Sequence, residues 1–220
     1  MSMKTVSYRG YSEMKKSMLT KSLSEFADML SSREPVPGGG GASALCAALG
    51  ASLGSMVVAL SLGKGKSPEE EAALQSLSAR AEKARDELLG LIDGDAEAFL
   101  PLATAYRLPK DAPGRAEERE RCLKLAASAP LRILELCCEV IALQEELSRL
   151  GSPLMRSDVA TGSVLAWGAM YGAAVNVLVN TKAMKDRPYA EELNRKVQTL
   201  MGEYWQRADR CYEDIFASLQ

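Results

Sequence analysis

Apolar residues recur three and four positions apart along most of the chain, which is the period of an α-helix. Alternating apolar and polar positions, which would indicate strands, are nearly absent. Glycine- and proline-rich breaks divide the helical pattern into segments. We therefore predict an all-α fold, built as an up-and-down helical bundle.

The predicted helices cover, in chain order, about residues 24–31, 42–62, 68–93, 95–106, 115–149, 158–184 and 189–219. The segment Pro35 to Gly41 is predicted to be a loop, and the helices 68–93 and 95–106 are either separate or continuous. Pro130 is expected to kink or interrupt the helix that contains it. We expect one helical domain over residues 21–220. Residues 1–20 are predicted to be a polar extension without fixed structure, whose removal should leave activity intact.

Two of these helices are unusual because they lie in uncharged stretches, Pro35 to Gly63 and Val159 to Thr181. Their length would allow each to cross a membrane. The other helices are amphipathic, however, and the mean hydropathy of the chain is −0.10. We therefore predict that the two uncharged helices pack together at the centre of the bundle and that no membrane is involved. Their apolar surface exceeds what one subunit easily covers, so we expect a homodimer or a higher homo-oligomer.

Composition narrows the chemistry available to the protein. The net charge is −2, from 27 basic and 29 acidic residues, which argues against nucleic-acid binding. Histidine is absent, and the five cysteines show no CxxC spacing, so we predict neither a metal site nor a disulfide framework. We expect buried thiols and a cytoplasmic location, because the N-terminus carries no apolar signal segment.

The glycine run before the second helix is a candidate binding site. Backbone amides at a helix N-terminus attract anions and polar groups, although a flexible turn is the simpler alternative. The later Gly65-Lys66-Ser67 is not the end of a Walker A motif, because Leu60 stands where that motif needs glycine. The candidate binding residues at this run are Pro37, Gly38, Gly39, Gly40 and Gly41.

Two acids and one lysine are candidates for chemistry. Asp95 and Phe99 are four positions apart and share a helix face, where an apolar surrounding would raise the pKa of the carboxyl. Asp158 precedes the second uncharged helix, and Lys64 follows the first. Helix capping is the alternative explanation for each of the three.

Asn176 and Asn180 lie one turn apart on an otherwise apolar helix. Buried amides need hydrogen-bond partners. These partners are either a ligand or a neighbouring helix.

Six segments stand out along the chain in a fixed order. They are PVPGGGGASAL at 35–45, SLGKGK at 61–66, DGDAEAF at 93–99, LPKD at 108–111, RSDVATG at 156–162 and NVLVNTKAMKD at 176–186. Together, across about residues 23–200, they resemble one known family in the order expected for it. This is the formiminotransferase-cyclodeaminase C-terminal domain family, which includes free-standing cyclodeaminases and methenyltetrahydrofolate cyclohydrolases.

The resemblance implies an all-helical dimer that binds tetrahydrofolate derivatives near the glycine run, with no prosthetic group. It implies a formiminotetrahydrofolate cyclodeaminase, which closes formiminotetrahydrofolate to 5,10-methenyltetrahydrofolate and releases ammonia. The alternative is a methenyltetrahydrofolate cyclohydrolase, which opens the methenyl bridge with water to give 10-formyltetrahydrofolate. A further alternative is a non-catalytic helical oligomeric binding protein.

Both reactions need a group that moves a proton at a tetrahedral carbon. In the absence of histidine, Asp95 is the first candidate for this role. Asp158 is the second candidate, either as a partner acid or as an acceptor for the pterin. Lys64 is a candidate for the glutamate tail or for stabilising charge, and Asn176 and Asn180 are candidates for orienting the pterin.

Overall fold

The computed structural model describes residues 17–220, and these form an all-helical bundle without strands. Its elements are η1 (Met18–Thr20), α2 (Leu23–Leu30), α3 (Gly39–Ser61), α4 (Pro68–Arg107), α5 (Arg115–Leu150), η2 (Pro153–Met155), α6 (Arg156–Ala183) and α7 (Arg187–Ala217). The all-α prediction is therefore confirmed. Of the predicted N-terminal extension, residues 1–16 lie outside the described part of the chain, while residues 17–20 lie within it and include η1.

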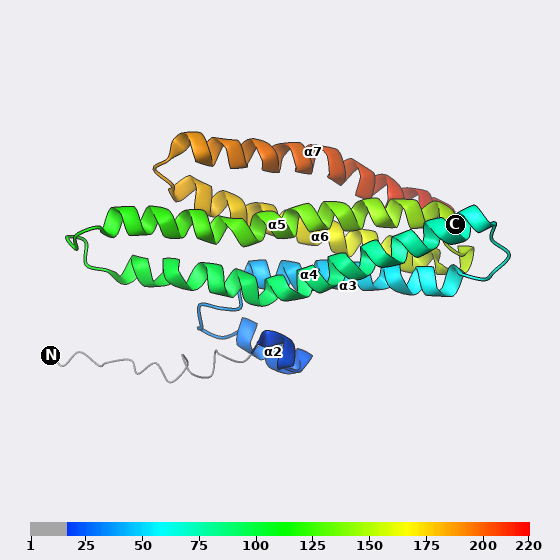
Figure 1. Ribbon diagram of the computed structural model, residues 1–220, viewed down its shortest axis with the longest axis horizontal. Coiled ribbons are helices and arrows are strands. Elements are labelled where there is room, and N and C mark those ends of the chain that lie inside the picture. The colour runs from blue at the N-terminus through cyan, green and yellow to red at the C-terminus, as the bar shows by residue number, and fades with distance from the viewer. Residues whose placement is uncertain (1–16) are drawn as a thin grey trace.

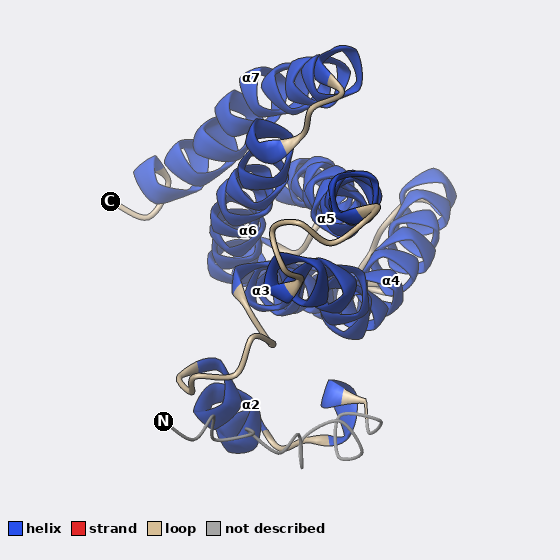
Figure 2. Cartoon of the chain, turned by 90° about the vertical axis from the view of Figure 1, so that its left-hand side faces the viewer, coloured by secondary structure: helices blue, strands red, loops and turns tan. Residues whose placement is uncertain are grey.

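The five long helices alternate in direction along a single axis, as predicted for an up-and-down bundle (Figure 1). Seen along that axis, α5 lies amid α3, α4, α6 and α7, whereas α2 lies below α3, outside the bundle (Figure 2). Seven of the largest fully buried side chains come from α5, namely Leu123, Ile133, Leu134, Leu136, Ile141, Leu143 and Leu147. The hydrophobic core therefore follows α5 along the length of the molecule.

The two uncharged helices, α3 and α6, pack closely and antiparallel to each other. A Cβ atom on Gly50 would lie 2.9 Å from the carbonyl oxygen of Gly162, so glycine is what allows this approach. Buried Gln144 of α5 fills the same region, and its side-chain amide donates to the carbonyl of Gly50 at 2.8 Å. Three helices thus meet at small residues, which explains the glycines at positions 50 and 54 of α3.

The helix boundaries differ from the sequence prediction at the glycine run. α3 begins at Gly39, so three of the four glycines form its first turn and the predicted loop ends at Gly38. The first amides of a helix have no partner within the helix, and here one of them turns toward another helix, as described below. Local sequence did not indicate this, because glycine is a poor helix former in isolation.

Two other uncertain boundaries are settled in favour of long helices. α4 continues without a break through Gly94 and also contains Pro101. α5 likewise contains Pro130 in its interior, and this proline is buried. Capping fixes the start of α4, since the hydroxyl of Ser67 accepts from the N–H of Glu70 while the carboxylate of Glu70 accepts from the N–H of Ser67. Acids 93 and 95 therefore do not cap a new helix.

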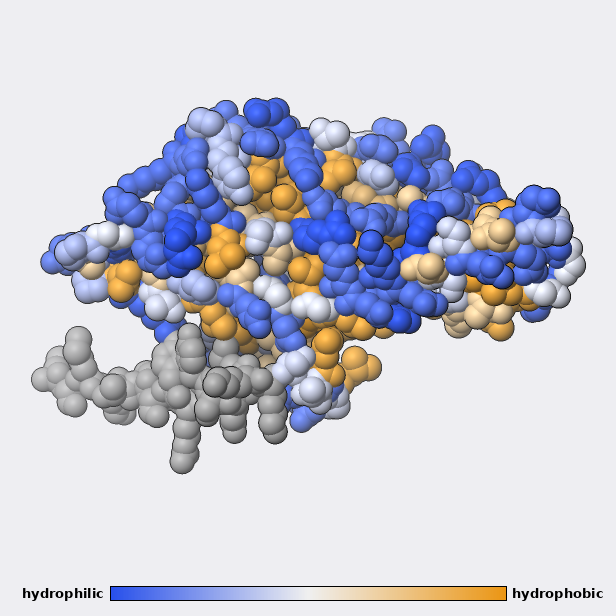
Figure 3. All heavy atoms as spheres, in the orientation of Figure 1, coloured by the Kyte–Doolittle hydropathy of each residue, from blue (hydrophilic) through white to orange (hydrophobic). Residues whose placement is uncertain are grey.

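Two segments, Gly39–Ser61 (α3) and Pro153–Ala183 (η2 and α6), are long and apolar enough to cross a membrane by length and composition alone. In the bundle, 50% of the most apolar part of the first and 44% of that of the second are buried. Their remaining surface is largely apolar, although α6 also exposes Arg156, Thr161 and Lys182. The exposed apolar side chains on these two helices are Leu49, Met56, Leu60, Val164, Tyr171, Val175, Leu178 and Val179. This set is called the α3/α6 face below. On the side of the molecule seen in Figure 3, in contrast, charged and polar side chains cover most of α4, α5 and α7.

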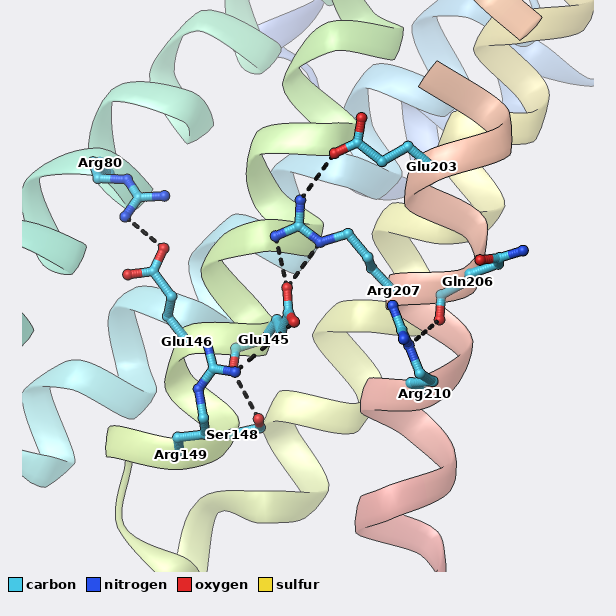
Figure 4. A network of polar contacts seen from close by, with 9 residues as sticks. All are labelled: Arg80, Glu145, Glu146, Ser148, Arg149, Glu203, Gln206, Arg207 and Arg210. Atoms are coloured by element: carbon cyan, nitrogen blue, oxygen red, sulfur yellow. Dashed lines mark hydrogen bonds and ion pairs between the residues drawn. The ribbon is translucent and has the colours of Figure 1, made fainter. Parts of the chain in front are cut away.

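Ion pairs join the amphipathic helices on their outer side. Arg207 of α7 binds Glu145 of α5 at 2.6 Å, and Arg80 of α4 binds the neighbouring Glu146 at 2.8 Å (Figure 4). Pairs this close to solvent contribute about 0–1 kcal/mol each. They therefore add little to the stability that the core provides. They connect α4 to α5 and α5 to α7.

Candidate active site

Asp95 of α4 lies directly against the first turn of α3. Its carboxylate occupies the space next to Gly40, where a Cβ atom would overlap both carboxylate oxygens. The backbone N–H of Gly41 donates to this carboxylate. A glycine-only helix start and a carboxylate from another helix therefore form one site, which the sequence predicted as two separate candidates.

Burial raises the pKa of the Asp95 carboxyl above its ordinary value, and the hydrogen bond from Gly41 acts in the opposite direction. The first effect is the larger one. No arginine or lysine contributes to this shift. A carboxyl in such an environment is suited to accept and return a proton, because its two protonation states lie closer in free energy near neutral pH.

Asn176 of α6 completes the third side of the site. A Cβ atom on Gly39 would lie 3.1 Å from the side-chain nitrogen of Asn176, and Gly39 itself is exposed. That nitrogen donates to the carbonyl of Gly172 at 2.8 Å. The side-chain oxygen of Asn176 lies 3.7 Å from the same Cβ position, so a ligand at the start of α3 could donate to it.

Asn180 lies one turn further along α6 and is buried. Its side-chain nitrogen donates to the carbonyls of Ala126 in α5 and of Asn176, at 3.2 Å and 2.9 Å. The partners of this amide are thus a neighbouring helix and its own helix, which was the simpler of the two expectations from the sequence.

Phe99 and Pro37 border the site from the apolar side. Phe99 is half-buried and packs against the main core cluster, one turn after Asp95. Pro37 is buried, and its Cβ lies 3.7 Å from the position of a Cβ atom on Gly41. Gly38 is the N-cap residue of α3 and has open space around it.

Lys64 and Asp158 lie at the other end of the bundle in the same chain. α3 has 23 residues and is therefore about 35 Å long, and Lys64 follows its last turn. Asp158 is in the first turn of α6, about 27 Å along that helix from Asn176. Within one chain, neither residue reaches the group formed by Asp95, Gly40 and Asn176.

One participant in this region was missed in the sequence. Asp93 accepts from the backbone N–H of Met18 at 2.8 Å and also from the hydroxyl of Ser17. Asp93 is two positions before Asp95, so residues 17 and 18 are fastened next to the site. The available indication was Asp93 itself, the first of the three acids in DGDAEAF, and the sequence gave no reason to connect it with the N-terminal segment.

Within residues 17–220, no group of three or more histidine, cysteine, aspartate or glutamate side chains is arranged to hold a metal ion. The five thiols are free, and four of them are buried. A hollow of about 460 Å³ lies between α4 and α5, beside Glu97 and Arg132, and none of the site residues named above lines it.

Comparison with known proteins defines the class first. Residues 22–199 match the model of the formiminotransferase-cyclodeaminase family. The fold agrees with this match: the crystal structure of formiminotetrahydrofolate cyclodeaminase from Thermotoga maritima superimposes with a TM-score of 0.79 at 28% identity, covering 90% of this chain and 98% of that one.

Individual relatives narrow the comparison. A methenyltetrahydrofolate cyclohydrolase of Methylorubrum extorquens is 38% identical over 89% of this chain and 96% of that protein. The formimidoyltransferase-cyclodeaminases of Gallus gallus and Rattus norvegicus are 30% and 32% identical over 86% and 85% of this chain. The chain spans only about a third of those two proteins, 36% and 35% of their lengths. The chain therefore belongs to the formiminotransferase-cyclodeaminase family, and it is an enzyme that acts on tetrahydrofolate derivatives.

Proposed function

We propose that the protein is a methenyltetrahydrofolate cyclohydrolase, which converts 5,10-methenyltetrahydrofolate and water into 10-formyltetrahydrofolate. The observation that carries this proposal is the 38% identity to a cyclohydrolase over nearly the whole of both chains. This was the alternative reading of the sequence, and the relatives favour it over the cyclodeaminase that the motifs first suggested.

The site chemistry supports the proposal. The carbon bridge of 5,10-methenyltetrahydrofolate is part of a cationic amidinium, which a nearby carboxylate stabilises. Water adds to this carbon and loses one proton, which Asp95 accepts. The bond from the carbon to N5 then breaks as a proton returns to N5, the hydroxyl becomes the formyl group on N10, and its proton is released to solvent. One carboxyl that changes protonation twice is sufficient for these steps.

The neighbouring groups are suited to position the folate. In our proposal, the amide of exposed Gly39 at the start of α3 and the side-chain oxygen of Asn176 bind polar atoms of the pterin ring, while Phe99 and Pro37 provide apolar contact. No step requires a prosthetic group. The substrate also makes the cytoplasm the expected compartment.

Cyclodeamination is the second candidate function. It is favoured by the 28% identity and TM-score of 0.79 to a free-standing cyclodeaminase of nearly the same length. That reaction closes the same ring and expels ammonia instead of opening it with water, so the same carboxyl would deliver a proton to the departing nitrogen.

A homodimer is the proposed assembly. The α3/α6 face is apolar and continuous with the two helices that carry the site, and large exposed apolar patches usually mark interfaces. Lys64 and Asp158 would take part in the reaction only if the partner subunit's copies reached the site in such a dimer. Light scattering coupled to size-exclusion chromatography tests the assembly, and a mass equal to one chain over a hundredfold dilution series would contradict it.

A side-by-side assay tests the function. Loss of the near-ultraviolet absorbance of 5,10-methenyltetrahydrofolate measures cyclohydrolysis, and ammonia release from formiminotetrahydrofolate measures cyclodeamination. We expect enzyme-dependent hydrolysis well above the buffer rate. Hydrolysis no faster than in buffer, with or without ammonia release, would reject the cyclohydrolase proposal.

A further inference from the structure

Residues 17–38 form a strap that leaves the bundle and returns to it at almost the same place. Its first residues, Ser17 and Met18, are bound to Asp93. Its last part reaches the first turn of α3, where Pro37 and the carbonyl oxygen of Ile92 lie within 3.7 Å of the Cβ position on Gly41. The strap is thus hydrogen-bonded to α4 at its start, through Asp93, and its end leads into the turn of α3 that packs beside Ile92 and Asp95.

The strap has few other attachments to the bundle. α2, its only α-helix, lies outside the bundle (Figure 2), and Phe26 is its one buried residue. Leu23 and Leu30 of α2 are 75% and 40% exposed. Apolar side chains of this helix are visible below the bundle in Figure 3. A segment held mainly at its two ends depends strongly on each fastening.

The fastening at Asp93 is a defined structure. Each carboxylate oxygen of Asp93 accepts one hydrogen bond, from the N–H of Met18 and from the hydroxyl of Ser17. The same Ser17 oxygen accepts from the N–H of Leu19 at 3.1 Å and so caps η1. Hydrogen bonds to an ionised acceptor are stronger than neutral ones, so Asp93 is a specific anchor for the start of the strap.

We propose that Asp93 is a positioning residue that latches the strap of residues 17–38 as one wall of the folate site. The proposal rests on the function proposed above. It assigns the two aspartates of DGDAEAF to different tasks: Asp95 acts on the substrate, and Asp93 holds the segment that leads into the glycine run. It also replaces the expectation that residues 1–20 are dispensable, because the latch includes Ser17 and Met18.

Limited proteolysis of the full chain tests the latch without any reaction. Trypsin cleaves after Lys21 and Arg33 within the strap. We expect Asp93→Ala to speed cleavage after Lys21 by about tenfold, since it removes both acceptors. Alanine preserves α4 because it is the best helix former. Asp86→Ala is the matched control: Asp86 lies two turns earlier on α4 and pairs with Arg85. Unchanged cleavage in Asp93→Ala would overturn the proposal.

Steady-state kinetics test whether the strap is a wall of the site. We expect Asp93→Ala to raise KM for 5,10-methenyltetrahydrofolate about tenfold with kcat within about twofold. Ser17→Ala should raise KM by a smaller factor. Ser17→Thr, which keeps the hydroxyl, should have the KM of the wild type. These serine variants test the latch even if Asp93→Ala does not fold. Faster cleavage with an unchanged KM would contradict the proposal that the strap forms a wall of the folate site.

Ligand protection separates this proposal from the proposed function. Saturating 5-formyltetrahydrofolate should slow cleavage after Lys21 in the wild type, because a folate in the site would contact the strap. If the wild type turned over neither substrate and gained no protection, the proposed function and the wall would fail together. The rates of cleavage in the ligand-free variants would still decide whether Asp93 is a latch.

Discussion

The two ends of the α3–α6 pair carry similar sequence features but differ in structure. At one end, Asp95 is set against Gly40 and beside Asn176, and burial raises the pKa of its carboxyl. At the other end, Lys64 follows α3 in the loop to α4, and Asp158 opens α6. Each end combines a helix terminus, glycines and an acid in contact, but only at the first end is the acid held between helices and partly removed from water. At the other end, the N–H of Gly63 donates to Glu71 at 2.7 Å in an exposed position.

The difference between the ends arises from the neighbouring helix. At the first end, α4 presents a carboxylate to a helix start without side chains, so the carboxylate is partly removed from water. At the second end, the N–H of Ser152 donates to the hydroxyl of Ser61 at 2.7 Å. This hydrogen bond joins the last residue of α3 to the turn between α5 and α6. A helix terminus is a candidate site when a polar side chain from another helix is buried against it and still has room to bind a ligand, because buried polar groups need hydrogen-bond partners.

Asp95→Asn is the strongest test of this contrast. The substitution keeps the shape and an acceptor for the N–H of Gly41 but removes the proton-transfer group. We expect kcat to fall about 10²–10⁴-fold. Absorbance assays of 5,10-methenyltetrahydrofolate hydrolysis measure this loss. Wild-type turnover in the variant would show that Asp95 is not the proton-transfer residue.

Gly40→Ala tests the close approach itself. The added Cβ would overlap the Asp95 carboxylate, so the carboxylate must move, and we expect activity to fall about 10²-fold. Gly90→Ala is the control, because a Cβ at this exposed position of α4 meets nothing within 4 Å. That substitution should raise the free energy of unfolding by about 0.5–1 kcal/mol and leave kcat unchanged. Equal activities of the two variants would contradict the geometry of the site.

Asn176→Ala and Asn180→Ala distinguish ligand binding from packing. We expect Asn176→Ala to raise KM about tenfold, because its oxygen is free to bind the substrate. We expect Asn180→Ala to lower the free energy of unfolding by about 1–3 kcal/mol and to leave KM nearly unchanged, because two buried carbonyls lose their donor. Urea denaturation and steady-state kinetics of both variants measure the difference. The reverse pattern would exchange the two roles.

Substitutions at the opposite end should have small effects. We expect Lys64→Ala and Asp158→Asn to change kcat/KM by less than about threefold, since these residues lie far from Asp95 in their own chain. A loss as large as that of Asp95→Asn would instead indicate a site shared between two subunits. In that case, mixing Asp95→Asn and Asp158→Asn proteins should restore part of the activity, because some mixed dimers would contain one intact site.

The smallest expected effect concerns stability and pH. Burial raises the pKa of folded Asp95 above its ordinary value of 3.8, so the folded chain retains this proton to a higher pH than the unfolded chain. Stability therefore falls as pH rises between these two values, and the loss is complete above the folded-state pKa. Asp95→Asn removes this loss, and we expect its Tm at neutral pH to equal or exceed that of the wild type. A clear decrease in Tm would contradict the desolvation of the carboxyl.

The pH dependence of activity has the same origin. The kcat/KM of the wild type should rise with pH through the same range, and the Asp95→Asn variant should lack this rise.

The sequence predicted the helices well because their signals are local. The three-to-four periodicity, the Ser67 capping box and the glycine and proline breaks depend on neighbours within a few positions. It failed at the start of α3, where Gly39 to Gly41 are helical. Asn176 and Asp95, which are distant in sequence, occupy the space that side chains at positions 39 and 40 would need. It also gave no connection between Asp93 and residues 17 and 18, which are separated by more than 70 positions.

The sequence by itself determined an all-helical chain, two uncharged helices, a carboxylate chemistry without histidine and a set of motifs typical of one folate enzyme family. The tertiary structure decided that Asp95 lies against Gly40, that Asn180 bonds to a neighbouring helix while Asn176 lies beside exposed Gly39, and that Asp93 accepts from Ser17 and Met18. The physical reason is that desolvation and hydrogen-bond partners are properties of packing. Asp95 and Asp158 have the same side chain, and only the helix packed against each one distinguishes them.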